Sequence, residues 1–219
     1  TTARHRPTQP ARSTPDTLRI GFVPLVHAAP LLVARDLGFF HQHGLRVRLS
    51  REVGWATVRE KIVTGELHAA QALAPMPLAT PLGLNCIPTP TLTALVLNLH
   101  GNAIVLSRAL WRACDGHPQS LPALRKQRAD PLTLGVVYPH SSHLFLMRQW
   151  CREANLMPDT DFRLVVVPPP QVVAHLAASH LDGVCVGEPW GSLAVRKGVG
   201  VIAAAGSKLL QADVAGLNI

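Results

Sequence analysis

The sequence contains an internal repeat, and this repeat constrains the fold more than any other feature. The segment Leu18-Arg-Ile-Gly-Phe-Val-Pro24 is matched by Leu132-Thr-Leu-Gly-Val-Val-Tyr-Pro139, and their glycines, Gly21 and Gly135, are 114 positions apart (135 − 21). Two further pairs of segments match at this spacing to within one residue: 31–35 with 144–148, and 67–75 with 181–189. We therefore expect two similar halves that follow each other along the chain.

Each copy has the pattern of alternating strands and helices. Strands are expected at 18–23, 45–52 and 68–73 in the first copy, and at 132–138, 162–167 and 183–187 in the second. Helices are expected near 28–40, at 55–66 and from Pro75 in the first copy, and at 142–155, 170–180 and from Pro189 in the second. This alternation favours parallel sheets covered by helices. The predicted fold class is α/β, with two parallel-sheet lobes and a cleft between them; one continuous doubly wound sheet is the alternative.

The predicted organisation has four parts: a disordered leader over 1–17, a first lobe over 18–105, a second lobe over 106–206 and a tail over 207–219. The leader is rich in Thr, Pro and Arg and lacks the apolar stretch of a signal peptide. The crossing between the lobes is expected in Pro90–Ser107, where Leu92-Thr-Ala-Leu-Val-Leu97 has the composition of a strand.

The composition is that of a globular protein with a positive charge. Of the 219 residues, 47% are hydrophobic and 16% are charged, which suffices for one sizeable core or two small ones. The formal net charge of +8 favours anionic partners without naming one. Because the basic residues are scattered and aromatic residues make up only 5%, direct nucleic-acid binding is not expected. No stretch approaches the roughly 20 unbroken apolar residues of a membrane span.

Catalytic and metal-binding patterns are weak. The chain has no G-x-S-x-G, P-loop or G-x-G-x-x-G motif, and Ser141 beside His143 lacks an acidic partner. His41 and His43 form an H-x-H pair, but no further ligand is evident. The four cysteines are widely spaced, and we expect unpaired thiols. We therefore predict no enzyme activity, no metal site and no cofactor.

A ligand site is expected at the turns between strands and helices. In open parallel sheets, ligands bind beyond the carboxyl ends of the strands, where loops enter helix N-termini. Those turns are Pro24–Pro30, Val53–Trp55, Ala74–Pro77, Tyr138–His143, Pro168–Gln171 and Gly187–Gly191. Helix N-termini that converge from two lobes favour an anion. Trp55 is an unusual residue for such a turn, although a Trp there can also pack as ordinary core.

At these turns the sequence resembles the nitrate- and bicarbonate-binding solute receptors of ABC transporters and the related cytosolic nitrate/nitrite sensors. The resemblance covers most of residues 18–200 and rests on Gly21–Leu25, Ala34–Phe40, Trp55–Lys61, Leu73–Leu78, His100–Ile104, Val167–Gln171 and Cys185–Trp190. It implies a type II periplasmic-binding-protein fold, whose two hinged lobes close on a small planar oxyanion without catalysis. The implied ligand is nitrate or nitrite, with bicarbonate in one branch. The implied partner is an ABC permease, or an RNA-binding antiterminator for the sensors.

The resemblance also implies the residues of the binding site. Trp55 would form an aromatic wall, and His143 corresponds to a ligand-contacting His. Asn102, after Gly101, stands where nitrate binders have Gln, so its amide would donate to the anion directly or through water. His143 would add charge if its pKa rises beside the anion. The remaining binding positions are Pro75, Gln171, Glu188 and Trp190.

One departure from the family lies near the C-terminus. Family members place a Lys that contacts nitrate in a segment after the sixth turn, and residues 200–219 have no clear counterpart, since Lys208 is not an obvious replacement. Members are also longer. The chain is therefore expected to be C-terminally truncated relative to the family, which would leave an unpaired sheet edge in the first lobe.

The leading hypothesis is a non-catalytic solute-binding protein that delivers nitrate or nitrite to an ABC transporter. The alternative is a cytosolic nitrate/nitrite sensor that acts through an antiterminator. A periplasmic location fits the first and a cytoplasmic location the second. Two further readings stay open: a protein for a thiamine-type pyrimidine, against which Ala74-Pro-Met-Pro77 and Val167-Pro-Pro-Pro-Gln171 argue, and a remnant that no longer binds a ligand.

Overall fold

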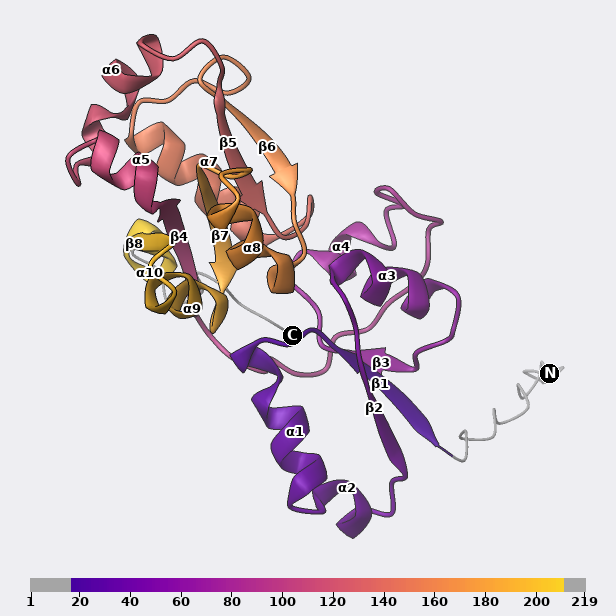
Figure 1. Ribbon diagram of the computed structural model, residues 1–219. Helices are drawn as coiled ribbons and strands as arrows, with labels where there is room; N and C mark the ends of the chain where they lie inside the picture. The colour runs from indigo at the N-terminus through magenta and orange to yellow at the C-terminus, as the bar shows by residue number, and fades with distance from the viewer. Residues whose placement is uncertain (1–16, 211–219) are drawn as a thin grey trace, which may run out of the picture.

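The computed structural model describes residues 17–210, and these form two β-sheets with helices packed around them (Figure 1). The first sheet has three strands in the order β2-β1-β3, and the second has five in the order β6-β5-β7-β4-β8. The leader predicted over 1–17 lies almost wholly outside the described residues, as does most of the tail predicted over 207–219.

The first lobe contains the parallel strands β1 (Leu18–Phe22), β2 (Val47–Arg51) and β3 (Ala69–Ala70). Its helices are α1 (Ala29–Asp36), α2 (Phe39–Gln42), α3 (Trp55–Val63) and α4 (Met76–Ala79), with a 3₁₀ turn over Val26–Ala28. The single helix expected near 28–40 is divided in two, because Gly38 adopts a left-handed conformation with φ of 73°.

The second lobe contains β4 (Asn102–Ser107), β5 (Leu132–Val136), β6 (Phe162–Val166), β7 (Gly183–Gly187) and β8 (Gly200–Ala205). Its helices are α5 (Arg108–Ala113), α6 (Leu121–Lys126), α7 (Ser142–Glu153), α8 (Val172–Ala177), α9 (Trp190–Arg196) and α10 (Gly206–Leu210), with 3₁₀ turns over Pro118–Ser120 and Pro169–Gln171.

The structure confirms the repeat. In both copies the first strand lies between the second and the third, and all three are parallel. A glycine occupies the same place in each central strand, because a leucine packs over it. A Cβ on Gly21 would lie 2.5 Å from Leu67, and a Cβ on Gly135 would lie 3.2 Å from Leu181. Both pairs have the spacing of the repeat, so the glycine makes room for the leucine that precedes the third strand of each copy.

The second sheet is mixed, which corrects the prediction of parallel sheets in both lobes. β4 runs antiparallel to β7 on one side and to β8 on the other. The predicted boundary after residue 105 cuts through β4, which belongs to the second sheet over its whole length. The stretch Leu92–Leu97, expected to be strand-like, forms no strand. Its lack of a neighbouring strand to share hydrogen bonds explains the error.

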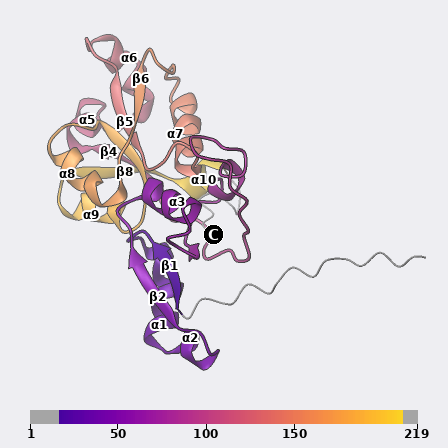
Figure 2. The ribbon, with the colours of Figure 1, turned by 90° about the vertical axis from the view of Figure 1, so that its right-hand side faces the viewer.

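Buried side chains form two clusters. One lies inside the second lobe, where Leu106, Leu134 and Leu146 are fully buried. The other joins the two lobes, and it contains residues from the ends of strands in both sheets. The lobes therefore share a core at their junction, while α1 and α2 project away from it at the far end of the first lobe (Figure 2).

Candidate functional site

The junction is built from residues that directly follow the strands of both sheets. Val23 and Trp55 from the first lobe pack in one cluster with Val137, Tyr138 and Val167 from the second. Gly54, which begins α3, approaches so closely that a Cβ there would lie 3.4 Å from Pro168. The helix N-termini expected to form the site are thus brought together, and the Trp55 indole lies between the lobes instead of inside one of them.

Polar contacts also cross the junction. Arg59 Nη1 donates to the Tyr138 hydroxyl at 3.1 Å, and Trp190 Nε1 donates to the Pro24 carbonyl at 2.9 Å. The Val26 amide donates to the carbonyl of Glu188 at 2.9 Å. These contacts join segments far apart in the sequence, and they fix the first turn of one copy against the third turn of the other.

His27 lies at the centre of this junction. It is buried, and its ring packs against Gly101 and Gly187, where added Cβ atoms would lie 2.5 Å and 3.1 Å from ring atoms. Gly101 also has a φ of 91°, a conformation that favours glycine. Any side chain at position 101 would therefore displace the histidine. Gly101 lets His27 approach β7 and Asn102, and its predicted contact with a ligand stays a prediction.

His143 lies in the first turn of α7 and is 1% exposed. Neither ring nitrogen has a hydrogen-bond partner among the described residues. Burial, and secondarily the nearby His27, lowers the pKa of His143 to about 3. The imidazole is therefore neutral at pH 7, and a gain of charge beside an anion stays a prediction. Ser141 caps the helix by accepting from the Leu144 amide at 3.2 Å.

Several buried polar atoms at the junction lack a hydrogen-bond partner within residues 17–210. They are Trp55 Nε1, Gln71 Nε2, Asn102 Oδ1, both ring nitrogens of His143, and Arg59 Nε. Buried polar groups are nearly always paired, since each unpaired group costs about 1–3 kcal/mol. Trp55, Gln71, Arg59 and one nitrogen of the neutral His143 supply unpaired N–H donors, which is the chemistry expected of a site that accepts an oxyanion, while Asn102 Oδ1 is an acceptor. These unpaired atoms come from both lobes.

Other predicted residues play different parts. Glu188 is half-buried and accepts from the Ser192 amide at 3.1 Å, so its carboxylate caps α9. The indole N–H of Trp190 is used by Pro24. Gln171 is exposed at the end of its 3₁₀ turn, and Pro75 precedes α4 with a half-buried ring. The structure thus groups Trp55, Gly101, Asn102 and His143 at the junction and gives the remaining four no unpaired group there.

Sequence reasoning missed three residues at the junction: His27, Arg59 and Gln71. Arg59 follows Trp55 by four positions, which places both on one face of α3, and this spacing was a usable signal. Gln71 directly follows β3 and holds the Val23 amide through its Oε1 at 3.2 Å. A polar residue immediately after a strand of two residues is a weaker signal. His27 carried none, because it lies in a turn among apolar residues.

Other chemistry is limited in the described part of the chain. Residues 17–210 contain no group of three side chains suited to a metal ion. No helix among them is both long and apolar enough to cross a bilayer. All four cysteines are free, as predicted; Cys114, Cys151 and Cys185 are buried and Cys86 is half-buried. Burial raises the pKa of the Cys151 thiol to about 12, so it is unreactive as a thiolate at neutral pH.

Comparison with known proteins identifies the family. A model of the NMT1-like family matches residues 11–213. The chain belongs to the NMT1-like family. A solved structure of the periplasmic nitrate-binding protein NrtA from Synechocystis superposes with a TM-score of 0.82 and 30% identity, over 88% of this chain and 52% of that one. The predicted resemblance to nitrate- and bicarbonate-type receptors is thereby confirmed, as is the type II periplasmic-binding-protein fold.

Two more relatives extend the comparison. The nitrate import ATP-binding protein NrtC from Synechocystis is 41% identical over 193 residues, which cover 85% of this chain but 28% of that protein. The nitrate/nitrite binding protein NrtA from Nostoc is 32% identical over 191 residues, covering 83% of this chain and 43% of that protein. This chain thus spans less than half the length of these curated relatives. An alkanesulfonate-binding protein from Xanthomonas, at 16% identity and a TM-score of 0.63, shares the fold.

Proposed function

We propose that this NMT1-like chain binds a small oxyanion at the junction of its lobes, without catalysis, and delivers it to an ABC transporter. The observation that carries the proposal is the set of buried unpaired polar atoms, which includes the N–H groups of Trp55 and Gln71. An anion such as nitrate accepts hydrogen bonds from all of these donors. Hydrogen bonds to the anion would offset the desolvation cost of these donors. This gives anion binding a favourable free-energy contribution.

The negative charge of the ligand needs compensation. The N-terminus of α3 and the N-terminus of α7 both lie at the junction and supply partial positive charge. Arg59 adds a full charge, since a guanidinium stays protonated. Its side chain is 17% exposed, its Nη2 lies 3.8 Å from the exposed Glu60 carboxylate, and its Nε is unpaired within the described residues. Arg59 is therefore the cation that we assign to the bound anion. His143 contributes a neutral N–H donor.

The choice among oxyanions depends on Asn102. Its Nδ2 donates to Ser142 Oγ at 3.3 Å, which leaves Oδ1 as a buried acceptor without a partner. Nitrate and nitrite only accept hydrogen bonds, so they require the amide to rotate and present Nδ2. Bicarbonate carries an O–H and matches Oδ1 as it stands. Nitrate or nitrite remains the leading ligand by similarity to NrtA, and bicarbonate is the alternative favoured by this atom.

The test is isothermal titration with nitrate, nitrite and bicarbonate. Trp55→Phe keeps the ring and removes the N–H, so it should weaken binding by about tenfold or more, the value of one hydrogen bond to a charged group. Trp111→Phe, on α5 in the second lobe, is the matched control and should bind as the unaltered protein does. Absence of heat with all three anions, or equal binding by Trp55→Phe, would count against the proposal.

The sensor remains the second candidate. The chain is 41% identical to a part of the nitrate import ATP-binding protein NrtC and 32% identical to NrtA of Nostoc, so its relatives include proteins that are not named as binding proteins. Such a unit would act on other proteins when it binds its anion, and it would work in the cytoplasm, whereas a delivering receptor works in the periplasm. Co-purification separates the candidates. An RNA-binding antiterminator that co-purifies with this chain and is released by nitrate supports the sensor.

A further inference from the structure

A cavity of about 780 Å³ lies on the outer side of the second lobe, away from the junction. Its walls come from the last half of α7, from the loop that follows α7 and from β6. Leu156 and Phe162 form part of its apolar floor, and Met157 is 64% exposed at its rim. The volume falls within the range of about 300–1,000 Å³ that is usual for ligand sites.

Three guanidinium groups line this cavity. Arg148 and Arg152 come from α7, and Arg163 comes from β6. Arg152 donates to Gln149 Oε1 at 2.7 Å, and Arg163 donates to Thr133 Oγ1 at 3.0 Å. Within the described residues, none of the three is paired with a carboxylate. Asp159 is the single acidic residue in the lining. The cavity therefore has an excess of positive charge that the protein leaves uncompensated.

The same cavity runs along an open sheet edge. Within residues 17–210, β6 pairs with β5 on one side, and its other edge carries only a short bridge from Pro158 to Phe162. The Val167 amide donates to Val136, and the Asp161 carbonyl accepts from Leu132, so odd-numbered positions face β5. Leu164 and Val166 therefore present their N–H and C=O groups outward. Val166 is 53% exposed.

We propose that an acidic, extended segment of a partner protein binds here by adding a strand to β6. Its backbone would pair with the outward groups of Leu164 and Val166. Its acidic side chains on the α7 face would then reach Arg148 and Arg152, while Arg163, which bonds to Thr133, projects from the opposite face of β6. Strand addition supplies affinity through main-chain hydrogen bonds, and the guanidinium groups supply the selection for carboxylates. The assignment is independent of the anion at the junction.

Two other uses of the arginines fit the structure less well. Charged side chains on an edge strand can serve only to prevent pairing between sheets. Such a role needs no cavity with an apolar floor beside them. A nucleotide would need an aromatic face for its base, and Phe162, the aromatic residue of the lining, is 2% exposed.

The experiment uses the full chain and a short fluorescein-labelled peptide in which Glu alternates with Val. Fluorescence anisotropy should detect binding that weakens as salt is raised. The double substitution R148E/R152E should reduce affinity at least about tenfold, and Val166→Pro, which removes one outward N–H, should reduce it about fivefold, amounts expected for ion pairs and one main-chain hydrogen bond. The matched control is Arg196→Glu on the exposed end of α9 in the same lobe, which should change affinity less than about twofold.

Two further peptides decide the mode of binding. A peptide with Lys in place of Glu should not bind. A peptide with N-methyl groups on alternate amides should bind at least about fivefold more weakly than its parent, since it cannot complete the ladder. Equal binding of the methylated peptide, or displacement of the parent peptide by inorganic tripolyphosphate with no effect of Val166→Pro, would show that the arginines act as a simple anion site and would overturn the proposal. Loss of binding in Arg196→Glu would also overturn it.

Discussion

The two copies of the repeat differ in what lies beside their third strand. In the second copy, β7 is flanked by β4, and β8 follows, so that β4 and β7 are buried along their whole length. In the first copy, β3 has two residues, and no strand within residues 17–210 lies beyond it. The same strand-helix-strand unit therefore supports a full core only where further strands extend it.

The difference extends to the helices. α7 buries five of its residues, whereas the equivalent α1 buries none. Val33, Leu37 and Phe39 are 48%, 60% and 45% exposed, although they are apolar. The stretch Leu92–Leu97, which begins with a fully exposed leucine, is also left uncovered. The two copies thus share strand order and direction but differ in how completely their helix side chains are buried.

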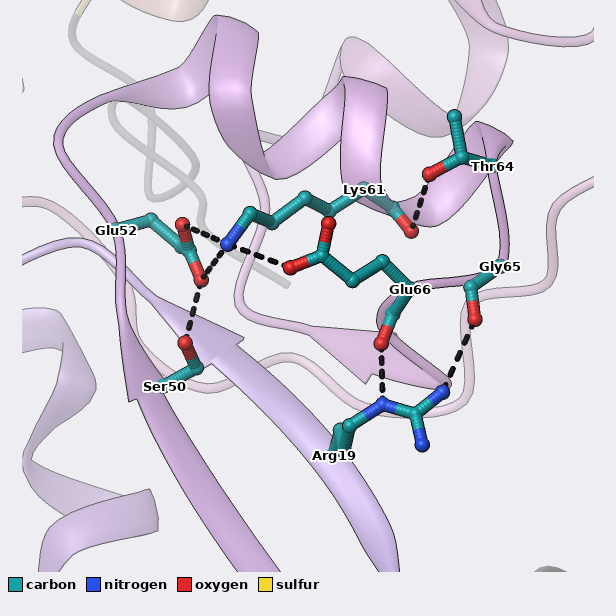
Figure 3. Close-up of polar contacts among 7 residues, drawn as sticks. All are labelled: Arg19, Ser50, Glu52, Lys61, Thr64, Gly65 and Glu66. Carbon is teal, nitrogen blue, oxygen red and sulfur yellow. Dashed lines mark hydrogen bonds and ion pairs between the residues drawn. The ribbon is translucent and has the colours of Figure 1, made fainter.

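At one pair of equivalent positions, the first lobe buries a charged side chain and the second buries an apolar one. Glu52 follows β2 as Val167 follows β6, and both are buried. Glu52 accepts from Ser50 at 2.7 Å and pairs with Lys61 at 3.2 Å, while Lys61 also reaches Glu66 at 2.9 Å (Figure 3). The hydrogen bonds to Glu66 and Glu52 raise the pKa of Lys61. Buried ion pairs add specificity more reliably than stability.

The largest expected effect compares equivalent core positions. Leu146 on α7 corresponds in the repeat to Val33 on α1, and their exposed fractions are 0% and 48%. Leu146→Ala should lower the free energy of unfolding by about 2–5 kcal/mol. Val33→Ala should change it by no more than about 0.5 kcal/mol. Urea denaturation followed by circular dichroism measures both, and equal costs would contradict the packing difference.

A second effect depends on pH and on the starts of the same two helices. His143 opens α7 where the first copy has Pro30. Its pKa is about 3 in the folded chain and 6.5 in the unfolded one, so the unfolded state alone takes up a proton as the pH falls below 6.5. Stability should fall by about 1.4 kcal/mol per pH unit, or about 2 kcal/mol between pH 7 and pH 5. His143→Gln should remove this loss.

The control for that prediction is His41→Gln on the exposed α2, which should leave the pH dependence of the unfolding midpoint as it is in the unaltered protein. His27 is buried near His143 and is left unchanged in every variant, so the comparison isolates the effect of His143. An unchanged pH dependence in His143→Gln would show that the ring is solvated in solution.

The smallest expected effect concerns the network in Figure 3. Lys61→Met leaves the buried Glu52 carboxylate without its cation and should lower the urea midpoint. The double substitution E52V/K61M gives the first lobe the residue type of the second and should restore the midpoint to its original value or above. A midpoint for Lys61→Met equal to that of the unaltered protein would contradict the dependence of Glu52 on its partner.

The fold could be predicted where the sequence pattern is local and repeated. The strands of both copies and the Gly21 and Gly135 positions follow from hydrophobic periodicity, and these predictions were confirmed. β4 and β8 were both missed as strands, because antiparallel pairing depends on contacts across long sequence separations. Trp55 and His143 lie at the junction, where their ligand contacts stay predictions, whereas Gln71 and Arg59 did not stand out in the sequence. Their importance lies in unpaired atoms, which a sequence does not display.

Within residues 17–210 the polypeptide passes from one sheet to the other only once, through the segment between α4 and β4. A protease that cuts in the exposed part of that segment would leave two fragments associated through the shared core and contacts such as that between Trp190 and Pro24. Whether the fragments then separate on dilution would report directly how strongly the halves hold each other, with and without an anion between them.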